Sequence, residues 1–281
     1  MPQSDMPTMR SRRLGGALRE LRTEAGLKVQ EVAERLECGH PKISQIENGK
    51  RGIRQLDLTL LLDLYGVTDE RLRGNLKRLA KDVHKVDWWS NSGPVLHDEL
   101  KDYLTLEWDS QLIRGYENQV VPGLLQTEAY MRRVIAAVEP GRLETLVETR
   151  LRRQQLLVDP PDFMLRVVLD VPALHRLPGP RRERREQLEH LLKVAERTNV
   201  SLQVLPLDAT LTVNQWPPFT VLSLRGDPPA DVVWLEHVTG GTLLQQRKDV
   251  PHYLDIWDEM TAAALSPVAS SDYLRELIKD A

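Results

Sequence analysis

The sequence predicts an N-terminal all-α bundle of short helices followed by a larger α+β (mixed α/β) domain. The chain has 281 residues, which is more than one average domain contains. Apolar residues recur every three or four positions between residues 14 and 85, whereas strand-like apolar runs alternate with charged helical segments later in the chain. The charge also changes sign: residues 1–80 have 15 Lys and Arg against 11 Asp and Glu (+4), and the remainder has 23 against 30 (−7).

In the N-terminal part, we expect a flexible arm over residues 1–12 and a helical domain over residues 13–85. Gly26, Asn48-Gly49 and Gly66 are typical of the turns that end helices. The helices between these turns are predicted near residues 14–25, 29–36, 40–48, 58–65 and 68–83.

The stretch VDWWSNSGP, residues 86–94, interrupts the helical pattern and is predicted to be a linker. The second domain then spans residues 95–281. Its predicted strands are 164–169, 201–205, 219–224 and 232–235. Its predicted helices are 95–116, one from residue 127, and 142–157, 180–197, 247–264 and 271–279.

Composition excludes several classes of protein. No apolar run approaches the roughly 18 residues that cross a membrane, and the N-terminus has no apolar segment after its basic residues. Cys38 is the only cysteine, so neither an internal disulfide nor a cysteine-cluster zinc site can form. These features predict a cytoplasmic protein that does not contact membranes.

Catalytic and cofactor signatures are missing from the sequence. The seven histidines lack metal-ligand spacing, and there is no G-x-S-x-G elbow, P-loop or dinucleotide fingerprint. We therefore expect no metal, no cofactor and no enzymatic activity. One weaker alternative is a fused enzyme such as a transferase, which would use Glu107, Glu117 and Glu236 with nearby arginines.

The most informative segment is residues 26–53. Two helices of about eight residues are joined by Glu37-Cys38-Gly39, a joint tight enough to set the second helix across the first. The major groove of B-DNA accepts one such helix. Ala33 is small where the two helices meet, and we expect Cys38, Ile43 and Ile46 to anchor the second helix from below.

The outer face of that second helix is polar. Gln45 suits adenine and Lys42 suits guanine, each pairing contributing roughly 1–3 kcal/mol of base discrimination. We expect Glu47 to brace the fold through an arginine such as Arg22. The predicted DNA-binding residues are His40, Lys42, Ser44, Gln45 and Asn48 for base edges, and Lys50, Arg51 and Arg54 for phosphates.

This segment resembles the XRE (phage-repressor-like) helix-turn-helix family over about 60 residues. The positions that match the family pattern are Gly26, Leu27, Glu31, Ala33, Leu36, Ile43, Ser44, Ile46, Glu47 and Gly49. Three positions depart from it: Val29 replaces the helix-opening Gln, Glu37 replaces the turn Gly, and Gly39 replaces the Ser that caps the recognition helix. The resemblance implies DNA binding by a homodimer.

Further segments resemble the C-terminal domain of WhiJ-like XRE-type regulators of actinobacteria. These segments are VPGLLQTEAY, RLRRQQLL, QLEHLLKVAERTNVSLQVLP, PPFTVLSL and VVWLE. The resemblance implies transcriptional control, often beside a small partner protein encoded nearby.

Two groups outside the helix-turn-helix are candidate ligand or partner sites. Trp88 and Trp89 either form a ligand platform or pack between the domains, and packing is the favoured interpretation. Arg150 and Arg153 either attract an anionic effector or lie on a solvated helix face that forms salt bridges, and the solvated face is favoured. The turn VPGLLQT is expected to be a structural corner rather than a binding loop.

Taken together, these features predict a sequence-specific transcriptional regulator that binds double-stranded operator DNA as a homodimer. Its second domain would sense a small-molecule effector or bind a partner protein. The alternative is an interaction protein of a toxin–antitoxin-like pair, the antidote with autoregulatory DNA binding.

Overall fold

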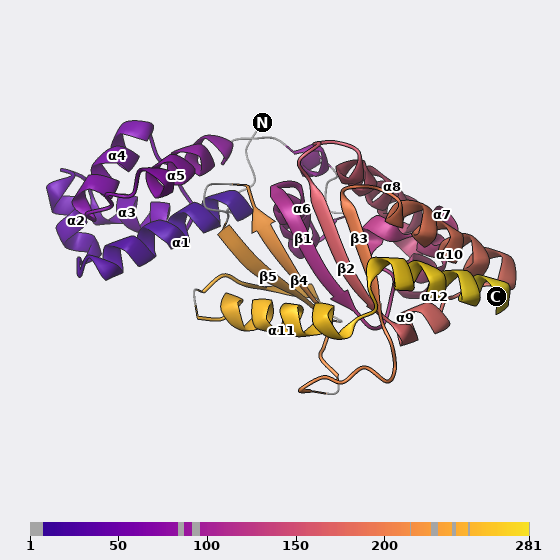
Figure 1. Cartoon of the computed structure of the whole chain (residues 1–281). Helices are drawn as coiled ribbons and strands as arrows, with labels where there is room; N and C mark the ends of the chain where they lie inside the picture. The colour runs from indigo at the N-terminus through magenta and orange to yellow at the C-terminus, as the bar shows by residue number, and fades with distance from the viewer. Residues whose placement is uncertain are drawn as a thin grey trace. The chain divides into compact units, whose positions relative to one another are not determined.

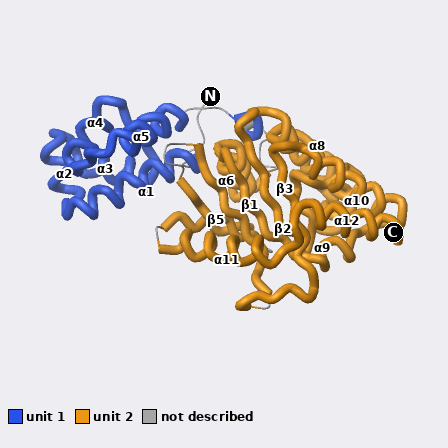
Figure 2. Tube along the Cα trace, in the orientation of Figure 1, with its two compact units in different colours: residues 1–91, 226–229 blue, residues 92–225, 230–281 orange. Residues whose placement is uncertain are grey.

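The computed structural model describes residues 8–83, 87–91, 96–213, 215–225, 230–237, 240–246 and 248–280. The chain divides into two units, one formed by residues 1–91 and the other by most of the remaining chain (Figure 2). The division falls inside the predicted linker, of which residues 86 and 92–94 lie outside the described residues. No helix in the described ranges is both long enough and apolar enough to cross a bilayer.

All the regular secondary structure that the structure describes in the first unit is helical. Its first helix begins at Met9, with the Thr8 hydroxyl accepting a hydrogen bond from the Ser11 backbone N–H at 3.1 Å. Residues 9–12, predicted as part of a flexible arm, are therefore helical, while residues 1–7 lie outside the described residues. The helices are α1 (Met9–Glu24), α2 (Val29–Arg35), α3 (His40–Glu47), α4 (Gln55–Leu64) and α5 (Glu70–Asp82), followed by the 3-10 turn η1 (Trp88–Asn91).

An aliphatic core joins these helices. Leu18, Val32, Leu58 and Leu62 are completely buried, and Cys38 packs against the same cluster, partly buried as a free thiol. Gly26, Gly49 and Gly66 adopt φ near +70° at the ends of α1, α3 and α4, a conformation in which glycine lacks the steric penalty of other residues. The predicted turn signals thus coincide with helix ends.

The second unit is built on one six-stranded sheet with the order β3-β2-β1-β4-β5-β6. Strands β1, β2 and β3 are parallel, whereas β4, β5 and β6 continue the sheet in antiparallel fashion. The strands are β1 (Ser110–Glu117), β2 (Met164–Asp170), β3 (Val200–Leu205), β4 (Phe219–Leu224), β5 (Ala230–His237) and β6 (Gly240–Leu244).

Four of these strands lie where the sequence predicts them, but β1 and β6 do not. The predicted helix over residues 95–116 is wrong in its second half: α6 (Asp98–Trp108) ends at the C-cap Asp109, and the chain then enters the centre of the sheet as β1. Residue 95 lies outside the described residues.

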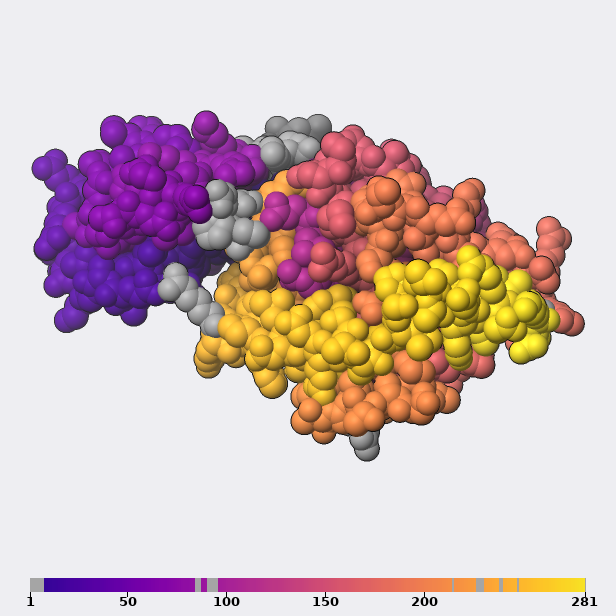
Figure 3. All heavy atoms as spheres, viewed as in Figure 1, coloured from indigo at the N-terminus to yellow at the C-terminus, as the bar shows by residue number. Residues whose placement is uncertain are grey.

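Helices cover both faces of the sheet. On one face lies α11 (Val250–Ala263) (Figure 1). Its Trp257 and Met260 are buried in one cluster with Tyr116 and Phe219 of the sheet. In the space-filling view, α11 and α12 (Pro267–Asp280) cover this side of the unit (Figure 3). The opposite face meets α6, whose Tyr103 ring lies 5.5 Å from that of Trp234.

The remaining helices complete a mixed α/β architecture, which confirms the predicted fold class. Helix α10 packs against both α12 and α7, and α7 packs against α8. These elements are η3 (Gly123–Leu125), α7 (Glu128–Val138), η4 (Pro140–Arg142), α8 (Leu143–Arg153), η5 (Gln154–Leu157), α9 (Val171–His175) and α10 (Arg181–Ala195).

Candidate DNA-binding surface

Helices α2 and α3 are joined by a four-residue turn, residues 36–39. The Lys28 N–H donates to Glu31 Oε2 at 2.6 Å and so fixes the start of α2. In the turn, the Cys38 N–H donates to the Ala33 carbonyl at 2.9 Å, and Glu37 adopts φ +49°. Gly39 is the N-cap of α3, and Pro41 occupies its first turn, where a missing N–H costs nothing.

Backbone contact with α1 fixes the position of α3. A Cβ atom added at Gly15 would lie 2.5 Å from the Ile46 carbonyl oxygen, and one added at Gly49 would lie 2.7 Å from the Arg12 backbone nitrogen. Side chains are therefore excluded from both positions. Ile43 and Ile46 are buried beneath α3, as the sequence predicts.

A buried ion pair also holds the end of α3. Arg22 Nε and Nη2 donate to the two carboxylate oxygens of Glu47 at 2.7 and 3.0 Å, and the Glu47 side chain is only 3% exposed. The hydrogen bond to Glu47 raises the pKa of Arg22. The predicted bracing of Glu47 by Arg22 is thereby confirmed, and Glu47 is not available to contact DNA.

Five of the predicted DNA-binding side chains are exposed and make no hydrogen bond or ion pair with any residue that the structure describes. Two of them lie on α3, and three follow it in the loop before α4. They are His40, Gln45, Lys50, Arg51 and Arg54. An exposed cationic loop next to an exposed polar helix face is the arrangement that phosphate contacts and base contacts require.

The other three predicted residues have partners within the protein. Lys42 Nζ lies 2.7 Å from Asp57 Oδ2, in a pair that is about one quarter exposed. The Asn48 amide donates to the Ser44 carbonyl at 2.8 Å and accepts from Arg19 Nη2 at 2.6 Å. Lys42 must leave Asp57 before it can contact a base. Sequence reasoning missed both Asp57 and Arg19, because neither lies within the helix-turn-helix pattern.

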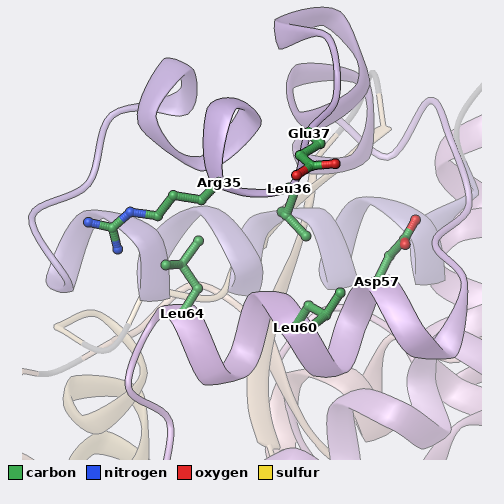
Figure 4. A pocket seen from close by; sticks show the side chains of 6 residues that line it. All are labelled: Arg35, Leu36, Glu37, Asp57, Leu60 and Leu64. Atoms are coloured by element: carbon green, nitrogen blue, oxygen red, sulfur yellow. The ribbon is translucent and has the colours of Figure 1, made fainter.

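A shallow hollow of about 470 Å³ lies beside the same motif, between the turn and α4 (Figure 4). Two of its lining side chains, Glu37 and Asp57, are acidic, and these disfavour a nucleic-acid phosphate. The remaining lining residues are Arg35, Leu36, Leu60 and Leu64.

The tryptophan candidates lie in η1 of the first unit. Trp89 is 3% exposed, and the two rings meet edge to face with centroids 5.1 Å apart. A buried indole is a packing element rather than an open ligand platform. The segment is also held by Asp87, which accepts hydrogen bonds from Arg10 at 2.7 and 3.0 Å.

The arginine candidates do not lie on a solvated face as favoured from the sequence. Arg153 forms two 2.8 Å hydrogen bonds to the buried Glu107, and Arg150 Nη1 donates to Gln126 Oε1 at 2.7 Å. Only Arg152, 54% exposed and 3.8 Å from Glu148, fits that interpretation. A run of arginines on a helix usually lies in solvent, whereas α8 turns Arg150 and Arg153 inward, where they satisfy the buried acceptors Gln126 and Glu107.

No group of three or more metal-ligating side chains occurs in the part of the chain that the structure describes. Glu107, Glu117 and Glu236, proposed from the sequence as a transferase set, do lie on one side of the second unit, but Glu107 is fully engaged by Arg153.

Comparison with protein families gives two matches. A helix-turn-helix domain model matches residues 13–74, so the first unit is a helix-turn-helix domain of a type that binds DNA. No curated protein and no solved structure matches the chain. The second match, to a domain of unknown function (DUF5753), covers residues 100–276 and therefore more than half of the sequence. By this match, the chain belongs to the DUF5753 family and carries a helix-turn-helix domain in front of the family's defining domain.

Proposed function

We propose that the protein is a cytoplasmic, sequence-specific transcriptional regulator that reads operator DNA with α3. The observation that supports this most strongly is an exposed polar helix face, with Gln45 at its centre, next to a loop whose cations form no ion pair with any described residue. The resemblance to WhiJ-like regulators supports the same role. The second domain acts by binding an effector or a partner protein, not by catalysis.

In this proposal the protein binds as a homodimer. A two-fold dimer of helix-turn-helix domains presents two recognition helices about 34 Å apart, which matches one turn of B-DNA. The operator is then expected to contain two half-sites related by inverted symmetry. Regulation follows when the second domain shifts the population between arrangements that can and cannot reach both half-sites.

The test is selection from random duplex DNA with the purified full-length protein at two salt concentrations. We expect enrichment of paired half-sites, and we expect the Lys42→Ala/Gln45→Ala double variant to lose that enrichment while keeping salt-sensitive binding. Lys50→Ala should weaken binding to all sequences alike and lower the salt slope by about one. Lys81→Ala, which removes a cation from the last turn of α5, is the matched control.

Asp57→Asn gives an opposite and independent effect. It removes the carboxylate that holds Lys42, so operator affinity should rise by roughly three- to tenfold. Sequence-blind binding by the wild type would instead favour the toxin–antitoxin-like interaction protein, which co-purification with a small partner protein would support. An unchanged operator preference in the double variant would refute the placement of α3 as the reading helix.

A further inference from the structure

The sheet face covered by α6 has an unfilled position at its centre. Gly115, in the middle of β1, is buried, yet a Cβ atom built on it would meet no atom within 4 Å apart from its chain neighbours. Protein interiors are normally packed as densely as organic crystals, with few voids larger than a water molecule. The open space above this buried strand residue therefore marks a gap in the packing of the sheet face.

The strand register shows which residues surround this space. Gly115 pairs with Thr220 of β4, and Thr220 pairs with Trp234 of β5, so these three residues point to the same face. Two residues further along, Glu117 of β1 and Glu236 of β5 also point to that face and lie in one transverse row. Their Cα atoms are two strand spacings apart, about 10 Å. Strand β4 lies between β1 and β5 but begins only at Phe219, one residue after this row, so no residue of β4 stands between the two glutamates.

Aromatic and cationic groups complete the wall above the sheet. The Tyr103 ring of α6 lies beside Trp234 and stacks under the Arg153 guanidinium at 5.3 Å. Arg153 forms an ion pair with Glu107. Arg150 Nη1 donates a hydrogen bond to the side-chain amide oxygen of Gln126, which is neutral. Burial lowers the pKa of Arg150 to about 10.

Acidic groups outnumber basic ones in this cluster, which has three carboxylates (Glu107, Glu117 and Glu236) and two guanidinium groups (Arg150 and Arg153). Neither Glu117 nor Glu236 makes a hydrogen bond or ion pair with any described residue. Burial and the neighbouring Glu236 carboxylate raise the pKa of Glu117 to about 8. Glu117 is partly buried and Glu236 is exposed. The fully buried carboxylates Glu47 and Glu107 both have arginine partners, Arg22 and Arg153. Beside the space over Gly115 there are thus two carboxylates that form no ion pair with any described residue, and two aromatic rings.

We propose that the open space over Gly115 is a cavity that binds a small organic cation, an ammonium group on a compact apolar body, between Glu117 and Glu236. The two carboxylates supply the charge, and the Tyr103 and Trp234 rings supply faces that attract a cation and apolar surface that accepts its body. This site goes beyond the DNA-binding proposal, and its test uses no DNA, so either can fail without the other.

The proposal predicts a definite pH dependence. The titratable groups that interact with Glu117 are Glu236 from β5, Tyr103 from α6, Tyr116 from β1 and Tyr130 from α7. Three further charged groups act on these in turn: Glu107 and Arg153 on Tyr103, and Arg150 on Glu236 and Tyr130. A cation binds the ionised form of Glu117, so binding releases the proton that this carboxyl holds below pH 8. Affinity should rise about tenfold per pH unit up to pH 8 and then level off.

The experiment is a titration of the full-length, 15N-labelled protein with n-butylammonium chloride at pH 8.5 and constant ionic strength. The indole N–H resonance of Trp234, assigned with Trp234→Phe, reports binding. We expect a saturable shift in the millimolar range, no comparable shift with the uncharged analogue 1-butanol, and at least tenfold weaker binding by Glu117→Gln. The matched control is Glu276→Gln, which removes a carboxylate in the same unit that is 70% exposed. This variant should bind n-butylammonium as wild type does.

Filling the cavity tests the geometry separately from the charge. Gly115→Val should abolish the n-butylammonium shift, and Gly115→Ala, whose single added methyl has room, should fold normally and weaken binding severalfold. The proposal is overturned if the wild type shows no saturable shift. It is equally overturned if 1-butanol acts like n-butylammonium, or if the two Gly115 variants bind as well as wild type.

Discussion

Two regions of the molecule differ in how closely they are packed and in how their charges are paired. One is the contact between α1 and α3, and the other is the sheet face around Gly115. At the first, Gly15 brings two backbones so close that no side chain fits, and the buried Glu47 is neutralised by Arg22. At the second, a glycine leaves space above it, and Glu117 has no cation beside it among the described residues.

This difference distinguishes a contact that maintains the fold from a region that can bind a ligand. Where packing and charge are both complete, substitution can only remove stability. Where neither is complete, the folded state retains an energetic cost that a ligand could relieve. The following predictions test this distinction, from the largest expected effect to the smallest.

The largest effect on stability is expected at the ion pair between Glu47 and Arg22. Glu47→Ala leaves the largely buried Arg22 guanidinium without its partner, and breaking a buried pair in this way typically costs about 3–5 kcal/mol. Chemical denaturation should show a loss of about 4 kcal/mol in the free energy of unfolding of the first unit. Asp57→Asn, which breaks the more exposed pair with Lys42, is the control and should cost less than about 1 kcal/mol.

The two glycines should respond to alanine in opposite ways. Gly15→Ala forces a methyl group against the Ile46 carbonyl and should cost about 3 kcal/mol. Gly115→Ala enters open space in a strand and should leave the stability unchanged or raise it by up to about 1 kcal/mol. Gly74→Ala, exposed in α5 with nothing nearby, controls for helix propensity and should stabilise by about 1 kcal/mol. Equal losses at Gly15 and Gly115 would remove the contrast between the regions.

For Glu117, we expect the free energy of unfolding to depend on pH, with an effect of intermediate size. Folding raises the pKa of Glu117 to about 8, so between pH 4.5 and 8 the native state holds a proton that the unfolded chain has released. Stability should therefore fall as pH rises through this window, by on the order of 2 kcal/mol for this group. Denaturation curves at pH 5 and pH 8.5 should show a smaller fall for Glu117→Gln than for wild type. Parallel curves for the two proteins would contradict the assignment.

The smallest effect is expected at the turn between α2 and α3. Glu37 adopts φ +49°, which costs a residue with a side chain about 1 kcal/mol relative to glycine. Glu37→Gly should raise the free energy of unfolding by about that amount. Glu34→Gly, inside α2, should instead lower it by a similar amount. Thermal denaturation of the two variants and of wild type measures both the expected increase and the expected decrease in stability.

The first unit could be predicted from sequence because its structure is local. Helical periodicity, turn glycines and the helix-turn-helix spacing all lie within a few residues of the structure they specify, and even the Glu47–Arg22 pair was foreseen. The partners of Lys42 and Asn48 were not, because Asp57 and Arg19 approach only when α4 and α1 pack beside α3.

The second unit was harder to predict because its decisive contacts are distant in sequence. Strand β1 was mistaken for helix: its α6-facing side carries Gly115 and Glu117, so the apolar alternation typical of a strand is missing there. The short β6 begins with two glycines and gives little strand signal. Glu107, Glu117 and Glu236 were recognised as a set, but only the register of β1, β4 and β5 places two of them in one row and leaves the third with Arg153.

The ion pair between Lys42 and Asp57 also bears on how quickly a regulator of this kind would find its operator. On random DNA, the ammonium group gains only phosphate contacts, which an internal carboxylate can match, so the side chain stays where it is. At the correct base the ammonium group exchanges its hydrogen bond to the carboxylate for one to a base acceptor, and this base contact adds to the others of the specific complex. The acidic Asp57 beside the recognition helix thus shortens residence on unrelated sequence and, because the pair has to break at the operator, also lowers operator affinity. The result is a faster search at some cost in operator affinity.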